Sequence, residues 1–523
     1  MKIGIVTGIL AKKAVESYLK ESCFKVEVIS LPSPVAALMS PQYIAKMLAS
    51  KDVSTFDIIL VPGMIFGDTF PIEKALGVPT FKGPKHAADL PVVLGMLGKI
   101  PLSKKVPACE LVIDLIRGQA MEEFDSVRRE AEKLSEEATA FAIGAGDERI
   151  FVGRGSPMYL LAEIVNAPNL TSRELQNWVD YYVGSGADIV DLGMLSGVSR
   201  PAEAKTMVQA AKAITSKPIS IDTNDVDEVR AAVEADVDLI LSVNALNMKD
   251  IAEIAVDTPI VVTPVDKQNL CPSDRAKKIQ QIEENIAMAK SLGFKKIIAD
   301  PVLTPTLMPN LTESLVVYFE FANRNPEVPF LFGAGNVTEL LDGDSVGANL
   351  LLAGLASELQ ASVILTTEAS CKTRGSVSEM STSIKMAALA GKRGSPPKDL
   401  GFDLLILKDK RVREEAFDPS MERGLRVLPK TEETGYQADP KGCFKILLDR
   451  ENRQIAVFHY SIGQLEPDAL IKGDNPAEIN AALIQNGLIS SLDHAAYLGA
   501  ELEKAKQALV TGKSYVQDQP LFQ

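Results

Sequence analysis

The chain has 523 residues, of which 46% are hydrophobic and 24% charged, the usual balance of a folded protein and not of a disordered one. At about 150 residues per domain, the length suggests three domains, or two if one of them is a barrel. The 69 acidic residues exceed the 55 Lys and Arg residues, and the net charge of −14 argues against a broad basic surface for nucleic acid or anionic membranes. We therefore expect small-molecule substrates, no nucleic-acid or membrane partner, and a homodimer as one possible assembly.

The cysteines lie far apart, with no Cys-X-X-Cys pair among them: Cys23, Cys109, Cys271, Cys371 and Cys443. This spacing fits neither a disulfide framework nor a thiolate zinc site, and it suits a reducing compartment. The apolar stretch at the amino terminus is too short for the hydrophobic region of a secretion signal. The apolar window 346–367 is interrupted by Asn349, Glu358 and Gln360, which favours a helix and a strand over a membrane span. We therefore predict a cytoplasmic protein.

The first 150 residues alternate predicted strands with predicted helices. Runs rich in β-branched residues occur at 2–8, 24–31 and 56–63, and helical stretches occur at 11–19 and 41–49. This alternation favours parallel βαβ packing, so we predict a Rossmann-like or flavodoxin-like α/β domain over residues 1–150. No Gly-X-Gly-X-X-Gly follows a strand, so the pattern does not indicate a dinucleotide site. A charged helix is predicted over 122–140.

A different regularity begins near residue 158. Eight strand candidates follow one another at 158–165, 187–193, 217–222, 237–243, 258–264, 295–300, 328–335 and 361–367. A helical pattern follows each of them, at 172–184, 202–215, 226–234, 248–255, 273–292, 311–323, 345–359 and 377–389. Eight strand-helix units of this size predict a (β/α)8 TIM barrel over residues 151–395.

Polar residues recur at the ends of these eight strands, where a barrel of this class carries its chemistry. They are Asn166, Asp191, Asp222, Asn244, Asp266, Asp300, Asn336 and Glu368. One such residue is commonly a turn or cap residue, whereas eight in phase indicate a site.

Pro396 and Pro397 end the barrel pattern and indicate a linker. The remaining residues, 396–523, predict a small α+β domain of unknown role. It contains an apolar run at 402–410, a β-hairpin at 443–460 and a helical part at 476–509 that Asn475 would cap.

Four segments at the strand ends resemble the pterin-binding family, which contains the dihydropteroate synthases and methyltetrahydrofolate-type methyltransferases. EIVNAPNLT at 163–171 resembles the first-strand Asn segment of the synthases, and GADIVDLGMLSGVSRP at 186–201 resembles their second-strand signature. PISIDT at 218–223 and IIADP at 297–301 resemble their third-strand and sixth-strand Asp motifs. The three-part architecture resembles that of archaeal and methylotroph dihydropteroate synthase-like proteins.

The resemblance implies a pocket for a reduced pterin, which would be a substrate. One carboxylate can accept the two adjacent N–H donors of the pterin's 2-amino-4-oxo edge, and Asp300 would be that carboxylate. Asp222 would hold further ring nitrogens, Asn166 would also bind the pterin, and Asn244, a shifted substitute for the fourth-strand Asn of the synthases, would do the same.

A second expected site binds an anion. Ser199 and Arg200 fall where the synthases have the Thr-Arg pair that meets the diphosphate of their substrate, and the fork of Arg suits phosphate. Lys372 and Arg374 lead into the last predicted helix and could add to this site, with Mg²⁺ as a possible further cation. These residues favour a synthase-like transferase that joins a dihydropterin-6-ylmethyl diphosphate to an arylamine, in folate-like or methanopterin biosynthesis.

Other positions resemble the methyltransferases instead. Asn336 stands where the synthases have a Lys, and GAGNV is closer to the methyltransferase motif whose Asn contacts the pterin near N5; Asn336 is therefore the catalytic candidate. Glu163 likewise resembles a methyltransferase residue. The alternatives are thus a methyltransferase that uses a methyl-tetrahydropterin, with a corrinoid or a protein as its acceptor, or a non-catalytic pterin-binding protein.

The three histidines, His86, His459 and His494, lie outside the predicted barrel, which therefore lacks the Arg-X-His pair of the synthases. His494 is the candidate corrinoid ligand in the methyltransferase alternative. No set of His, Cys and carboxylate residues has zinc spacing, so the sequence predicts no metal ligands.

Overall fold

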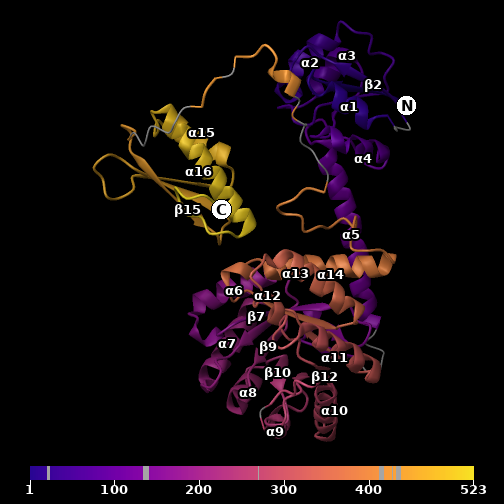
Figure 1. The fold of residues 1–523 in the computed structure, drawn as a ribbon, viewed down its shortest axis with the longest axis vertical. Helices are drawn as coiled ribbons and strands as arrows, with labels where there is room; N and C mark the ends of the chain where they lie inside the picture. Colours follow the sequence, from indigo (N-terminus) through magenta and orange to yellow (C-terminus); the bar gives the residue numbers. More distant parts are fainter. Residues whose placement is uncertain are drawn as a thin grey trace. The chain divides into compact units, whose positions relative to one another are not determined.

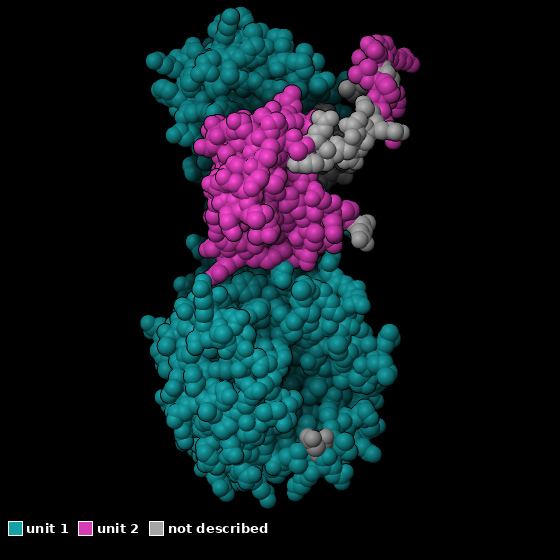
Figure 2. Space-filling model, turned by 90° about the vertical axis from the view of Figure 1, so that its left-hand side faces the viewer, with its two compact units in different colours: residues 1–414 teal, residues 415–523 magenta. Residues whose placement is uncertain are grey.

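The computed structural model describes residues 1–20, 24–133, 140–268, 270–410, 417, 419–426, 428–430 and 438–522. Contacts between residues divide the chain into two compact units, Met1–Glu414 and Glu415–Gln523 (Figure 2). Within the described part of the chain, no helix combines the length and the apolar character needed to cross a membrane.

A four-stranded parallel sheet with the order β2-β1-β3-β4 opens the first unit. Its strands are β1 (Lys2–Thr7), β2 (Lys25–Ser30), β3 (Ile58–Val61) and β4 (Thr80–Lys82). The helices of this part are α1 (Lys12–Tyr18), α2 (Pro41–Leu48), α3 (Phe70–Leu76) and α4 (Leu90–Gly95). The predicted parallel α/β architecture is confirmed, whereas the short elements α3 and β4 were not predicted.

The long helix α5 (Ala108–Glu132) follows this sheet. The helix predicted over 122–140 is its second half, and residues 134–139 lie outside the described residues. Arg128 donates from both terminal nitrogens to the buried Asp188 carboxylate, each at 2.7 Å, and Asp188 also accepts from the Leu160 N–H. This bidentate pair anchors α5 to the start of β8, and the Leu160 N–H links the same carboxylate to β7.

Eight parallel strands form the next sheet, in the order β12-β11-β10-β9-β8-β7-β14-β13. They are β7 (Tyr159–Ile164), β8 (Ile189–Gly193), β9 (Ile219–Asp222), β10 (Leu239–Val243), β11 (Ile260–Val262), β12 (Ile297–Ala299), β13 (Leu331–Gly333) and β14 (Val363–Thr367). A parallel bridge between Ala299 and Phe330 joins the two ends of this order. All eight predicted strands are present, and the (β/α)8 barrel is confirmed.

Helices surround the eight strands (Figure 1). They are α6 (Ser172–Gly184), α7 (Pro201–Ile214), α8 (Val226–Val233), α9 (Met248–Ala255), α10 (Arg275–Ser291), α11 (Leu311–Arg324), the one-turn α12 (Gly335–Thr338), α13 (Ser345–Glu358) and α14 (Ser376–Arg393). Local signals fix several boundaries. At α6, for example, Thr171 accepts from the Glu174 N–H while the Glu174 carboxylate accepts from the Thr171 N–H.

Successive side chains along each strand point alternately outward and inward, and this alternation divides the apolar residues of the barrel into two layers. On β7, Leu160, Ala162 and Ile164 pack against the helices, whereas Tyr159 and Leu161 belong to the inner cluster. A hairpin of β5 (Phe141–Ile143) and β6 (Ile150–Val152) contributes its apolar side chains to this inner cluster. The hairpin closes the amino end of the barrel, so inward-facing polar residues concentrate at the carboxyl ends of the strands.

The second unit contains β15 (Cys443–Asp449), β16 (Gln454–Tyr460) and β17 (Ala469–Gly473), followed by α15 (Pro476–Gln485) and α16 (Leu492–Thr511). The predicted hairpin and the Asn475 cap are confirmed, because Asn475 Oδ1 accepts from the Ala477 N–H at 3.0 Å. The predicted helical part is two helices, and β17 was not predicted. The apolar run 402–410 forms no strand.

Candidate active site at the carboxyl end of the barrel

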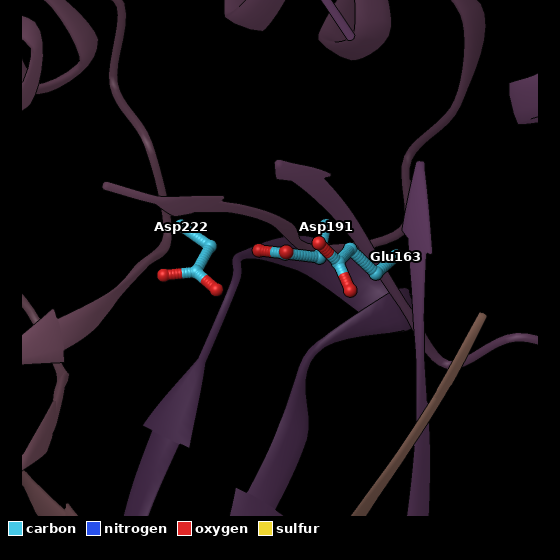
Figure 3. A group of neighbouring side chains, drawn as sticks. All are labelled: Glu163, Asp191 and Asp222. Carbon is cyan, nitrogen blue, oxygen red and sulfur yellow. The ribbon is translucent and has the colours of Figure 1, made fainter. Parts of the chain in front are cut away.

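Three carboxylates from consecutive strands converge at the carboxyl end of the barrel (Figure 3). Glu163 lies near the end of β7, Asp191 lies in β8, and Asp222 ends β9. One oxygen of each carboxylate lies within 4.8 Å of one oxygen of both others. In Figure 3 the carboxylate of Asp191 lies between those of Glu163 and Asp222.

Strand register explains how this acidic triad of Glu163, Asp191 and Asp222 assembles. Glu163 pairs with Asp191 across β7 and β8, and Gly193 pairs with Asp222 across β8 and β9. A Cβ atom on Gly193 would lie 2.6 Å from Glu163 Oε1, closer than real Cβ contacts. The absent side chain therefore provides the space that the Glu163 carboxylate occupies.

Asp191 is the most deeply buried member of the triad, with an exposed fraction of 0%. Its Oδ1 accepts from the Ser220 hydroxyl at 2.6 Å, whereas its Oδ2 has no hydrogen-bond partner among the described residues. Burial raises the pKa of Asp191 well above its usual range, and the negative charges of Asp222 and Glu163 act in the same direction.

The other two carboxylates of the triad are also perturbed. Burial and, to a smaller extent, the negative charges of Asp222 and Glu339 together raise the pKa of Glu163 to about 7. Burial also raises the pKa of Asp222, against the opposing effect of the hydrogen bond that the Ser242 hydroxyl donates to it. The barrel thus concentrates negative charge where the strands end.

Ser242 adopts a left-handed backbone conformation, with φ of 60°. This conformation is uncommon for a residue with a side chain and indicates a backbone held by its surroundings. The following Asn244 is buried, and its amide donates to Asn224 Oδ1 at 3.0 Å and to the Ser242 carbonyl at 3.1 Å. In this structure, the Asn244 side chain thus joins the end of β10, at Ser242, to the loop after β9, at Asn224.

Asp300 follows β12, and its Oδ1 accepts from the Val302 N–H at 2.8 Å and from the Tyr318 hydroxyl at 3.0 Å. Val302 has φ of 64°, which is strained for a β-branched residue, and its carbonyl accepts from the buried Lys278 at 2.9 Å. Burial raises the pKa of Asp300 to about 6, although both hydrogen bonds lower it. This carboxylate is therefore mainly ionised above neutral pH.

Two asparagines predicted at the site have exposed side chains. Asn336 lies in α12, and its Nδ2 donates to the Leu303 carbonyl at 3.0 Å, which joins the loops after β13 and β12. Asn166 follows β7 with φ of 53°, a left-handed conformation that Asn tolerates in turns.

The predicted anion residues lie on two loops that flank β7 in the sheet order β8-β7-β14. Ser199 is exposed, and Arg200 precedes α7 with its backbone N–H bonded to Glu228 Oε1 at 2.7 Å. Lys372 pairs with the exposed Asp342 at 3.1 Å, and Arg374 lowers the pKa of Glu368 electrostatically, against the larger effect of burial that raises it. The fold thus places all four residues at the carboxyl end of the barrel.

The chain matches known families in three segments. Residues 171–370 match the family described as pterin binding enzyme, residues 2–85 match a family of unknown function, DUF6513, and residues 438–518 match PterinBD-DUF4346. An uncharacterized protein of Methanocaldococcus jannaschii is 38% identical over an alignment of 537 residues. The alignment covers 100% of this chain and 99% of that protein. The barrel segment belongs to the pterin-binding enzyme family, and the chain as a whole belongs to one family with the Methanocaldococcus jannaschii protein. The resemblance predicted from the strand-end motifs is confirmed.

Two solved structures similar to the pterin-binding barrel are dihydropteroate synthases. The enzyme of Stenotrophomonas maltophilia is 20% identical, with a TM-score of 0.39 over 48% of this chain and 98% of that one. The enzyme of Coxiella burnetii, in complex with pteroic acid, is 21% identical, with a TM-score of 0.38 over 47% of this chain and 97% of that one.

Exposed apolar side chains surround the mouth of the pterin-binding barrel, and each of five loops at the carboxyl end carries at least one. They are Val198, Leu246, Leu270, Leu307 and Leu340. Leu307 is 91% exposed, and its neighbour Met308 is 82% exposed. Exposed large apolar residues gathered at one end of a fold indicate a surface that contacts a ligand or partner.

The sequence did not identify every residue of this site. Tyr318 and Lys278, which support Asp300 and its loop, come from helices α11 and α10, and no local pattern distinguishes them from ordinary helix residues. Asp191 was noted only as a strand-end residue. Its place beside Glu163 could have been found from the two-residue alternation of β7 and β8, which points both side chains inward.

Two histidines outside the pterin-binding barrel have carboxylate partners. His459 Nδ1 lies 2.5 Å from Asp468, and His494 Nδ1 lies 3.1 Å from Asp439. Both imidazoles are buried beside Phe444 in the second unit, whereas His86 is exposed. His494, the candidate corrinoid ligand of the methyltransferase alternative, thus packs in the core of the second unit in this structure.

Proposed function

We propose that the pterin-binding barrel joins a dihydropterin-6-ylmethyl diphosphate to an arylamine, in folate-like or methanopterin biosynthesis. The amine nitrogen forms a bond to the methylene carbon, the carbon–oxygen bond to the diphosphate breaks with its electron pair, and the amine proton passes to solvent. This proposal rests on one observation: two hydrogen bonds hold the Asp300 carboxylate in a fixed position directly after β12.

Asp300 has the acceptor capacity that a pterin edge needs. A carboxylate offers about four lone-pair sites, and the two hydrogen bonds of Asp300 both use Oδ1. The Tyr318 hydroxyl also lies 3.1 Å from the Leu331 carbonyl, so its single proton can turn to that acceptor. Both Asp300 oxygens can then accept one N–H donor each from the 2-amino-4-oxo edge, while Asp222 accepts from the opposite part of the ring.

The flanking loops support the diphosphate part of the proposal. Arg200 would stabilise the departing diphosphate, because no acceptor among the described residues bonds its guanidinium. Lys372 and Arg374 add positive charge from the loop after β14. The exposed apolar side chains on the loops at the carboxyl end, such as Leu307, suit the ring of an arylamine. A Mg²⁺ ion would supply further positive charge at the diphosphate. Among the side chains of Ser199, Arg200, Lys372 and Arg374, only the Ser199 hydroxyl offers such an ion an oxygen ligand.

The decisive experiment incubates the full-length protein with a dihydropterin diphosphate and a set of arylamines while released pyrophosphate is measured. Pyrophosphate release that requires both substrates supports the proposal. Pterin binding without release, with every amine tested, would favour the non-catalytic alternative.

Methyl transfer from a methyl-tetrahydropterin is the second candidate, and Asn336 favours it. Its Nδ2 is bonded to the Leu303 carbonyl, so the orientation of the amide is fixed. No group among the described residues donates to its Oδ1, which can therefore accept from a ring nitrogen. Demethylation of a methyl-tetrahydropterin by the protein with an added corrinoid acceptor, without pyrophosphate release in the first assay, would favour this candidate.

A further inference from the structure

We propose that Glu163, Asp191 and Asp222 bind one divalent, oxygen-preferring cation of the class that includes Mg²⁺, Mn²⁺ and Ca²⁺. This site is separate from the diphosphate loops and does not depend on which reaction the barrel performs. It shares Asp222 with the proposed pterin pocket, so one Asp222 oxygen would bind the cation and the other would accept from the pterin ring. Its ligands would be three carboxylates on the rigid ends of β7, β8 and β9 (Figure 3).

The spacing of the oxygens fits such an ion. Two oxygens on opposite sides of a Mg²⁺ ion are about 4.1 Å apart, and on a Ca²⁺ ion they are about 4.8 Å apart, given ion–oxygen distances of about 2.05 and 2.4 Å. The three ligand oxygens lie within 4.8 Å of one another. A single ion can therefore contact all three with at most a small inward movement.

The buried oxygen of Asp191 points to a missing partner. Asp191 is fully buried, its Oδ2 has no hydrogen-bond donor among the described residues, and the two neighbouring groups are also carboxylates. An unpaired buried carboxylate oxygen is costly, and its neighbours make it more so. A cation would satisfy this oxygen and offset the mutual repulsion of the triad.

Among the described residues, no Lys or Arg side chain pairs with the triad. The charged groups that most shift the pKa values of Glu163 and Asp191 are themselves acidic. Elsewhere in the barrel, buried carboxylates do have basic neighbours: Asp188 pairs with Arg128, and Lys278 lowers the pKa of Asp300. The triad thus differs from Asp188 and Asp300, each of which has a basic side chain nearby.

The ligand set also indicates the type of ion. It contains oxygen atoms and no sulfur or imidazole nitrogen, which favours hard cations over zinc or copper. Glu163 and Asp222 are partly exposed, so an ion can reach Asp191 from their side. The remaining coordination positions would be open to water.

Mn²⁺ is a suitable probe because its unbound form is measured directly by electron paramagnetic resonance. The full-length protein, freed of metal with a chelator, is titrated with Mn²⁺ at about pH 8, where carboxylates compete least with protons. We expect one Mn²⁺ per chain, displaced by Mg²⁺ or Ca²⁺. Asp191→Asn and Glu163→Gln should each weaken Mn²⁺ binding about tenfold or more, with unchanged circular dichroism.

Asp300→Asn is the matched control, since it removes an acidic group at the same end of the barrel but outside the triad. It should change Mn²⁺ affinity by no more than about threefold while it impairs pterin binding. Equal Mn²⁺ binding by the wild type, Asp191→Asn and Glu163→Gln would overturn the proposal. Failure to bind one Mn²⁺ per chain would also overturn it. In that case, an infrared band of a protonated carboxyl group that disappears in Asp191→Asn would show that the triad shares a proton instead of a cation. Pterin binding measured with chelator present tests the proposed function separately.

Discussion

The Glu163 carboxylate occupies the place of the side chain that Gly193 lacks: a Cβ atom at residue 193 would lie 2.6 Å from Glu163 Oε1 and 3.3 Å from the Ile164 carbonyl. The backbone carbonyl cannot move without disturbing β7, so an added methyl group must displace the Glu163 side chain. The acidic triad therefore depends on a glycine that contributes no ligand atom.

Gly193→Ala should accordingly weaken Mn²⁺ binding about tenfold or more while leaving the barrel folded. Gly184→Ala is the control, because nothing lies within 4 Å of a Cβ atom at that position. Titration of both variants under the conditions used for the wild type checks this. Wild-type affinity in Gly193→Ala would mean that Glu163 is not a ligand.

Asp300→Asn should weaken binding of a reduced pterin about tenfold or more. The amide replaces an ionised acceptor, and charge-assisted hydrogen bonds are worth about 1.5–3 kcal/mol. Fluorescence titration of the wild type and the variant measures the change. If the variant bound pterin as tightly as the wild type, the pterin edge would lie elsewhere in the barrel.

The affinity for a pterin should fall as the pH decreases below about 6, by about tenfold per pH unit. Burial raises the pKa of Asp300 to about 6, and only the ionised form accepts both N–H donors. The Tyr318 hydroxyl lowers this pKa, so Tyr318→Phe should move the midpoint to higher pH. Tyr182→Phe, which removes a hydroxyl bonded to the Glu163 carbonyl, is the control and should leave the midpoint in place. Identical pH profiles for the wild type and Tyr318→Phe would exclude Asp300 as the titrating group.

Arg200→Ala should impair use of a dihydropterin diphosphate far more than binding of the bare pterin. Arg200 directly precedes α7, on the loop after β8, and its guanidinium would contact only the anionic part of the substrate. Comparing the KM for the diphosphate with the Kd of the pterin tests this. Equal losses for both ligands would count against a diphosphate site at this loop.

Asn336 separates the two candidate reactions. If methyl transfer is the chemistry, Asn336→Ala should lower turnover of a methyl-tetrahydropterin, with little change in pterin affinity, since Asp300 and Asp222 govern binding. If condensation is the chemistry, Asn336→Lys should be tolerated, because it restores the residue of the synthases. Parallel assays of both variants for demethylation and for pyrophosphate release distinguish these outcomes.

Much of the barrel was predictable because its pattern is local. Each strand is a short, largely apolar run, each helix has apolar spacing, and the two alternate eight times, so all eight strands were found. The place of Asp300 after β12 follows from the same regularity. Tyr318 could not be found in this way, because its contact with Asp300 depends on how α11 packs against the strands.

The acidic triad shows a second limit of the sequence. Glu163 and Asp222 lie 59 positions apart on strands that do not pair directly, and the Glu163 carboxylate has room beside them only because residue 193 has no side chain. Likewise, β17 and α3 were missed because they are short and lack a clear apolar period.

The hairpin β5–β6 precedes the first barrel strand in the chain, yet its Ile143, Ile150 and Val152 complete the inner apolar cluster. A fragment that began at residue 151 would lack β5, and water would reach Tyr159 and Leu161 from the amino end. The barrel is therefore not a module that starts with its own first strand. Any recombination event, natural or engineered, that moves this barrel into another protein has to carry the chain from Phe141 onward.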